Sequence, residues 1–252
     1  MASHKEIKAR IAEYYRFNKN EVSGLAIVTL ITAFIFSICG VGASWECSTN
    51  EPTDLALWFG RLMLLLVIVA VSIIFRASIQ KMYALAQGYK ITMKTWYVGN
   101  YIALALSLLS FGSFNLVLSG SFESAFMVKQ RLGEFRYGFS NLENAFIGLF
   151  GMVSSILLAL IFGILSFAYP ENIIYSKAVN INLIMGFCNL LPFPQLDGLK
   201  MFFGSRPLYY ISFIVMLLSS ILILSGTRIG LIALVILMAL GIIFFVLKGS
   251  EK

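Results

Sequence analysis

The chain consists of long apolar runs separated by short polar segments, and this pattern restricts its fold more than any other feature. A helix that crosses a bilayer needs about 20 mostly apolar residues, because no water is present there to bond exposed backbone groups. Apolar residues make up 59% of the chain and charged residues 12%. Soluble domains have roughly 45–50% apolar and about 25% charged residues. The sequence therefore predicts an integral, multi-pass, all-α membrane protein.

Six to seven runs have the length and composition of membrane-spanning helices. Each of them carries at most one charged residue. They lie near residues 22–43, 55–75, 97–118, 145–169, 178–198, 207–225 and 230–247. The fifth run is the shortest and leads directly into Pro192 and Pro194. Proline removes a helical hydrogen bond, so the sequence leaves two alternatives for this run: it crosses the bilayer, or it ends at the bilayer surface.

The polar segments divide the chain into three predicted parts. These are a basic cytosolic or interfacial tail at 1–21, a membrane core at 22–205 and a pair of C-terminal membrane helices at 206–252. In the tail, Ile7 and Ile11 begin an apolar spacing that is typical of an amphipathic helix lying on a membrane. A solvated tail that only sets the orientation of the protein fits the same residues.

The distribution of basic residues predicts the orientation. Residues 1–20 carry five Lys or Arg, the 44–54 loop carries none and residues 76–96 carry four. Cytoplasmic segments of membrane proteins are enriched in Lys and Arg, so the N-terminus is predicted to be cytoplasmic. The 119–144 loop has three Lys or Arg and three Glu, and does not indicate a side.

Composition also excludes several kinds of partner and site. The basic residues behind the net charge of +7 lie between apolar runs, so we expect contact with the lipid bilayer and no nucleic-acid partner. The only histidine, His4, is in the tail, and Cys39, Cys47 and Cys188 lack the spacing of metal ligands. The sequence therefore predicts no metal site built from imidazoles or thiolates, and no cofactor.

One acidic residue stands out, because an ionisable group at membrane depth is costly and usually functional. Asp197 follows an apolar run and two prolines, in the pattern Asn189-x-x-Pro192-x-x-x-Leu196-Asp197-Gly198. This pattern resembles the NxxPxxxLDG motif of the site-2 protease family of intramembrane zinc metalloproteases. The resemblance implies a zinc-ligand position for Asp197, and for Asn189 a position beside the reacting carbonyl.

The same family carries HExxH on an earlier membrane helix, where two histidines bind zinc and the glutamate activates water. Aligned through Gly88, the matching stretch is Arg76-Ala77-Ser78-Ile79-Gln80. Arg76 replaces the first histidine, Ala77 the glutamate and Gln80 the second histidine. The resemblance covers roughly residues 60–205. Its weakest part is 149–155, where Gly151 is retained but Met152 and Ser155 replace a proline and an asparagine.

These replacements predict a degenerate member of the family without zinc-dependent proteolysis. Zinc hydrolases use about three protein ligands, mostly imidazoles, and Arg76 would repel the cation. Ala77 cannot act as a general base. The protein is therefore expected to bind a transmembrane helix or another membrane partner without cutting it. The alternatives are an active intramembrane metalloprotease whose zinc site lacks histidine, and a small transporter, which the absence of internal repeats disfavours.

The residues around the degenerate site lead to two structural hypotheses. Arg76 either pairs with Asp197 in place of zinc, with Gln80 donating to the same carboxylate, or reaches outward to the lipid headgroups. Residues 89–98 alternate partly in polarity, as a strand or an interfacial loop would. For this segment we favour the loop.

Overall fold

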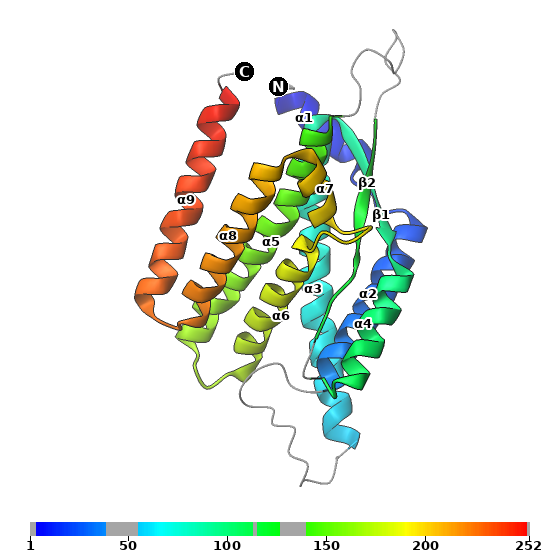
Figure 1. Ribbon diagram of the computed structural model, residues 1–252, viewed down its shortest axis with the longest axis vertical. Helices are drawn as coiled ribbons and strands as arrows, with labels where there is room; N and C mark the ends of the chain where they lie inside the picture. The colour runs from blue at the N-terminus through cyan, green and yellow to red at the C-terminus, as the bar shows by residue number, and fades with distance from the viewer. Residues whose placement is uncertain (1–3, 39–54, 113–114, 127–139, 251–252) are drawn as a thin grey trace.

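The computed structural model describes residues 4–38, 55–112, 115–126 and 140–250. The 44–54 loop with Cys47, Cys39 and much of the 119–144 loop lie outside them. The described residues form mainly helices, with one pair of strands (Figure 1). The elements in chain order are α1 (His4–Tyr14), α2 (Lys19–Ile38), α3 (Leu55–Gln87), β1 (Tyr89–Thr95), α4 (Tyr97–Leu109), β2 (Gly120–Phe126), α5 (Asn141–Ala168), α6 (Ile173–Leu190), α7 (Asp197–Gly204), α8 (Arg206–Leu224) and α9 (Arg228–Ser250).

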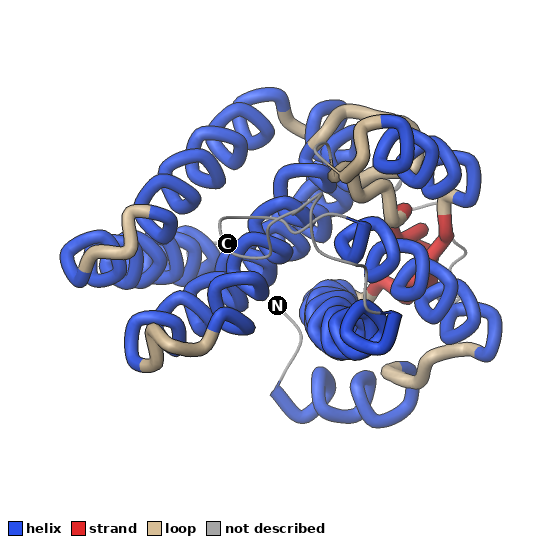
Figure 2. Tube along the Cα trace, turned by 90° about the horizontal axis from the view of Figure 1, so that it is seen from below, coloured by secondary structure: helices blue, strands red, loops and turns tan. Residues whose placement is uncertain are grey.

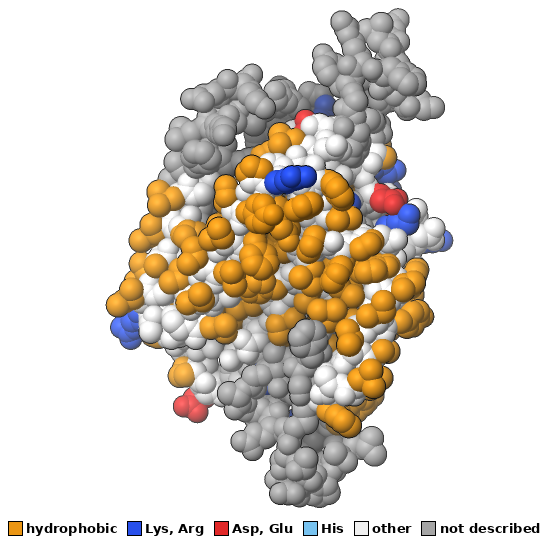
Figure 3. All heavy atoms as spheres, viewed as in Figure 1, with side chains coloured by type: hydrophobic (Ala, Val, Ile, Leu, Met, Phe, Trp, Pro, Cys, Tyr) orange, Lys and Arg blue, Asp and Glu red, His pale blue; other side chains and the backbone are white. Residues whose placement is uncertain are grey.

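Five of the described helices are long and apolar enough to cross a bilayer, namely α2, α3, α5, α6 and α8. Hydrophobic side chains form a broad area over the middle of the face in Figure 3, as expected where lipid tails surround a protein. The chain is therefore a multi-pass, mainly helical membrane protein, as the apolar runs predicted. Helix α6 ends at Leu190, before Pro192, so the predicted run at 178–198 is divided between α6, a turn and α7.

The predicted span at 97–118 is wrong. Helix α4 has 13 residues and ends at Leu109, where Phe111 and Gly112 turn the chain with φ values of 50° and 73°. At about 1.5 Å per residue, such a helix covers only about 20 Å of a hydrocarbon layer that is about 30 Å thick. Moreover, Thr95 pairs with Gly120, so the chain between them leaves the sheet and returns to the same place. The described residues between the strands, 96–112 and 115–119, thus belong to a hairpin and not to a single crossing.

Strands β1 and β2 form an antiparallel sheet with Tyr89 opposite Phe126 and Thr95 opposite Gly120. The preference for an interfacial loop at 89–98 is therefore wrong. Gly88, with a φ of 92°, ends α3 and turns the chain into β1. Figures 1 and 2 show the sheet at one side of the helical bundle.

Helix α5 lies at the centre of the bundle, in contact with α3, α6, α7, α8 and α9. Its small residues, including Gly148, Gly151, Ser154 and Ala159, are buried and allow these neighbours to approach closely. One apolar cluster joins α2, α3 and α6, and another joins α5, α6, α8 and α9. The short α7 is held against α5, which fixes the position of its first residue, Asp197.

His4–Tyr14 of the tail form the helix α1, and the segment after it is tied to the core. Lys81 of α3 is almost fully buried and donates to the Glu21 carboxylate at 3.1 Å and to the Arg16 carbonyl at 3.1 Å. The Lys81 ammonium also lies 4.2 Å from the centre of the Phe17 ring. Glu21 accepts from the Met93 backbone N–H at 3.1 Å, so the start of α2 is joined to both α3 and β1.

Candidate functional site

The site forms where α3, α5 and the start of α7 meet. Helix α6 ends at Leu190, and the following turn includes Gln195 with a φ of 62° before α7 begins at Asp197. Gly198 lies so close to the end of α6 that a Cβ there would overlap the Leu190 carbonyl. Only glycine therefore allows α7 to begin at this point, and the turn directs Asp197 towards α3.

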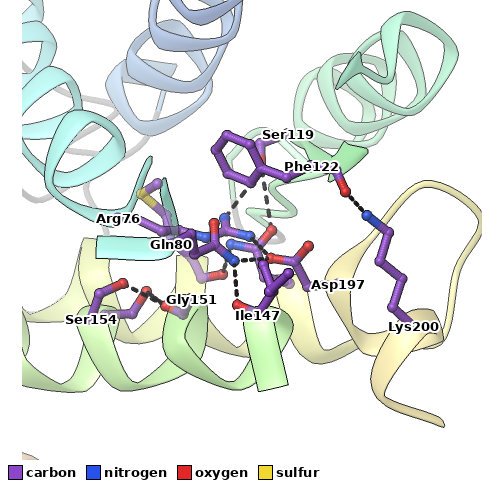
Figure 4. A network of polar contacts seen from close by, with 12 residues as sticks. Arg76, Gln80, Ser119, Phe122, Ile147, Gly151, Ser154, Asp197 and Lys200 are labelled. Carbon is purple, nitrogen blue, oxygen red and sulfur yellow. Dashed lines mark hydrogen bonds and ion pairs between the residues drawn. The ribbon is translucent and has the colours of Figure 1, made fainter. Parts of the chain in front are cut away.

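Arg76 and Gln80 lie one turn apart on α3 and both contact Asp197 (Figure 4). The Arg76 Nη2 is 2.5 Å from Oδ2 of Asp197, and the Gln80 Nε2 donates to the same oxygen at 2.8 Å. Arg76 is only 5% exposed and Asp197 3%. The predicted pairing is present, and the outward orientation of Arg76 is not.

The pair differs in one respect from the two-bond arrangement that a guanidinium offers a carboxylate. Arg76 uses Nη2 for Asp197, whereas its Nη1 donates to Oγ of Ser119 at 3.5 Å. Ser119 in turn donates to Oδ1 of Asn189 at 3.2 Å, and Asn189 donates to the Met185 carbonyl at 2.7 Å. Asn189 is therefore linked to Asp197 through Ser119 and Arg76.

Helix α5 closes the site from the other side. The Gln80 Nε2 also donates to the Ile147 carbonyl at 3.1 Å, and a Cβ on Gly151 would overlap the Gln80 amide. Glycine at 151 is thus required for Gln80 to reach both acceptors. Met152 and Ser155 are buried but do not contact Asp197: Met152 packs in the apolar cluster, and Ser155 donates to its own helix.

Ala77 lies beside these polar groups without joining them. It is 1% exposed and packs with Tyr89, Ile91 and Phe122 in an apolar cluster beneath the sheet. Its methyl group has no proton to give or take, so no side chain at this position can activate water.

Two further polar residues of the site were not predicted from the sequence. Ser119 lies at the end of an apolar run that we interpreted as a span. Lys200, on α7, donates to the Phe122 carbonyl of β2. Burial lowers the pKa of Lys200, which the neighbouring Asp197 carboxylate partly opposes. Neither residue belongs to a motif, and a lysine near a predicted helix end is usually a solvated group.

The residues of the site do not fit a zinc ion. Zinc takes about four ligands from thiolate, imidazole or carboxylate groups. Within the described ranges, no three His, Cys, Asp or Glu side chains lie together in a way that could hold a metal. Asp197 is the one carboxylate of the cluster, and the Arg76 cation lies directly against it. A fixed positive charge at this distance would repel a divalent cation.

Two buried atoms of the cluster lack hydrogen-bond partners, namely Nε of Arg76 and Oε1 of Gln80. Orienting the Gln80 amide the other way would turn its oxygen towards the Asp197 carboxylate and the Ile147 carbonyl, which are both acceptors. The Gln80 Nε2 is therefore fixed as the donor, and this orientation leaves the Gln80 Oε1 without a hydrogen-bond partner.

Comparison with known proteins finds a distant metalloprotease-like relationship. The chain is 26% identical over 190 residues to a Methanocaldococcus jannaschii protein with the name "Putative zinc metalloprotease". The match covers 74% of this chain and 85% of that protein. No protein-family model matches the chain, and no solved structure matches it.

Proposed function

We propose that this protein is a catalytically inactive, site-2-protease-like membrane protein that binds a transmembrane helix or another membrane partner without cutting it. The observation that carries the proposal is the buried ion pair of Arg76 and Asp197, reinforced by Gln80. Asp197 and Asn189 belong to the motif that resembles the family's, and Arg76, Ala77 and Gln80 occupy the positions of its HExxH. The distant metalloprotease relative supports this relationship.

The chemistry of the cluster explains why hydrolysis is not expected. Peptide hydrolysis requires an activated water and a group that stabilises the developing oxyanion. Arg76 and Asp197 neutralise each other, and Ala77 supplies no base. What remains is a closed polar contact that holds α3, α5 and α7 together, which suits a binding scaffold better than a catalyst.

An active metalloprotease with a non-standard metal site is the second candidate, favoured by the name of the relative. The two are separated by incubating the purified protein with a generic transmembrane substrate, with and without a chelator. We expect no chelator-sensitive cleavage and far less than one zinc ion per chain by elemental analysis. Chelator-sensitive cutting that is lost in Asp197→Ala, together with about one bound zinc ion, would establish the enzyme instead.

A restoration experiment tests the relationship to the family directly. The triple variant Arg76→His, Ala77→Glu, Gln80→His would place two imidazoles beside Asp197, since residues 76 and 80 already contact it. We expect this variant to bind about one zinc ion, which elemental analysis and thermal stabilisation by added zinc would detect. The matched control carries the same changes with Asp197→Ala and should bind zinc far more weakly.

The topology that fits these observations has six spans. They are α2, α3, α5, α6, α8 and α9, with the run at 97–118 excluded and the N-terminus in the cytoplasm. In Figure 1, α1 and the end of α9 lie at the same end of the molecule, as an even number of crossings requires. Labelling of single cysteines at positions 8 and 171 by an impermeant reagent in intact cells tests this. Only position 171 should react.

A further inference from the structure

The turn between α5 and α6 forms a pocket with a volume of about 340 Å³. The residues that line it are Ala168, Tyr169, Pro170, Glu171, Asn172 and Tyr175. Helices α5 and α6 are both long and apolar enough to cross a bilayer, so the turn lies where they leave it. The pocket is therefore at the level of the lipid headgroups, at the end of the bundle opposite to α1 (Figure 1).

The pocket is separate from the cluster around Asp197. Gly151 of α5 lies against that cluster, whereas Ala168, at the end of the same helix, lines the pocket. The two residues are about five helical turns apart, or about 26 Å along the helix. A ligand in the pocket would therefore not touch the residues of the candidate site.

Two tyrosine rings form part of the pocket lining. The ring centroids of Tyr169 and Tyr175 are 6.3 Å apart, and the ring planes meet at 44°. One cation can therefore lie within about 6 Å of both centroids, which is the range of cation–π attraction. Tyr169 is 60% exposed, so its ring is accessible to a ligand. Tyrosines at a bilayer surface also act as interfacial anchors, but that role requires neither a pocket nor a neighbouring carboxylate.

The charge of the pocket favours a cation over an anion. Among the described residues, Glu171 is the only charged residue of the lining, and it forms no ion pair with another of them. The aromatic residues beside this turn already accept one cation, because the Arg228 guanidinium lies 5.2 Å from the centre of the Phe167 ring. Arg228 itself does not line the pocket.

We propose that this pocket binds a quaternary ammonium group, with Tyr169 and Tyr175 against its methyl groups and Glu171 balancing its charge. Aromatic faces recognise such groups well, whereas a primary ammonium is more strongly hydrated and leaves water less readily. The volume of the pocket suits a ligand of the size of choline. Choline itself and the headgroup of phosphatidylcholine both carry this group, and both can reach a pocket at the bilayer surface.

The test is a titration of the purified full-length protein with choline in a maltoside detergent. Binding is followed by saturation-transfer difference NMR of the choline methyl protons. The matched probe is the uncharged isostere of choline, in which a carbon atom replaces the nitrogen. We expect saturable binding of choline and no saturable binding of the isostere, because only the cation is attracted to the aromatic faces.

Four variants make the result specific. Tyr169→Leu should weaken choline binding about fivefold, the factor for one cation–π contact at an exposed site, and Tyr169→Phe, which keeps an aromatic face, should restore most of it. Glu171→Gln should weaken binding and reduce its dependence on salt concentration. Tyr210→Leu removes another exposed tyrosine, on α8 and outside the pocket, and should bind choline like the wild type.

A second arm distinguishes a lipid headgroup from a soluble ligand. The titration is repeated in nanodiscs of phosphatidylethanolamine with phosphatidylglycerol, and in nanodiscs of phosphatidylcholine with the same share of phosphatidylglycerol. Weaker choline binding in the second set would identify the lipid headgroup as the occupant, and equal binding would identify a soluble ligand. Either result upholds a quaternary ammonium site.

Three results would overturn the proposal. They are equal binding of choline and its isostere, unchanged choline binding in Tyr169→Leu, and the absence of saturable choline binding both in detergent and in nanodiscs without phosphatidylcholine. None of these measurements depends on whether the protein cuts or binds a membrane partner, so the proposed function is tested separately.

Discussion

Arg76→Met is the most informative single change, because it removes the charge of a buried pair while keeping an apolar side chain of similar length. Breaking such a pair from one side typically costs about 3–5 kcal/mol, since the other charge is left buried without compensation. Asp197 is 3% exposed, so water cannot replace the guanidinium. Gln80 still donates to Oδ2 at 2.8 Å, and a hydrogen bond to a charged group contributes about 1.5–3 kcal/mol. We therefore expect a loss of about 2–4 kcal/mol in the free energy of unfolding.

The assay is equilibrium unfolding in mixed micelles, followed by circular dichroism. The matched control is Lys94→Met, which breaks the ion pair with Glu123 on the sheet, where both side chains are more than half exposed (57% and 59%). An exposed pair contributes about 0–1 kcal/mol, so the control should lose little. The double variant Arg76→Met, Asp197→Met should recover much of the loss, because no unpaired charge remains. If Arg76→Met costs no more than Lys94→Met, the buried pair does not hold the helices together.

Three other outcomes are expected. Gly151→Ala should lower stability by about 1–3 kcal/mol, because the new methyl group overlaps the Gln80 amide, whereas Gly241→Ala, at a site with open space, should be neutral or slightly stabilising in the same unfolding assay. Burial and the hydrogen bond to Glu143 raise the pKa of Tyr89 from 10.0 to about 12, so its contribution to stability is complete below about pH 10 and is lost as the pH rises towards 12. Thermal unfolding across that range should show a steeper decline for the wild type than for Tyr89→Phe; parallel curves would contradict this assignment. Glu21→Gln should weaken the contact with Lys81 and loosen β1 at Met93, which faster hydrogen exchange of the Met93 amide would report and unchanged exchange would refute.

The contact between Arg76 and Asp197 could be predicted because two simple patterns meet there. Residues 76 and 80 are one helical turn apart and share a face, and Asp197 follows a proline-rich turn that ends an apolar run. A single unpaired charge at membrane depth is costly, so an arginine and a carboxylate that both lie there are expected to pair even though they are far apart in the sequence. Arg76 makes one hydrogen bond to Asp197 and not two, because its other terminal nitrogen, Nη1, donates to Ser119.

Ser119 and β2 could not be predicted, for a common physical reason. The apolar residues of 97–118 satisfy a membrane environment equally well in a single crossing and in a hairpin that returns, and composition does not distinguish the two. The turn at Phe111 and Gly112 decides between them, but neither residue interrupts the apolar pattern. Once the hairpin was missed, Gly120–Phe126 appeared to lie in an ordinary loop, and its small and polar residues gave no alternation to indicate a strand.

The return of the chain from Thr95 to Gly120 has a consequence for the proposed six-span topology. Because β1 and β2 pair with each other, the described residues between them do not add a crossing, and each later helix runs in the opposite direction to the one that a full crossing would have given. In the proposed topology, the sheet and α7 therefore lie towards the same side of the membrane as the N-terminal tail.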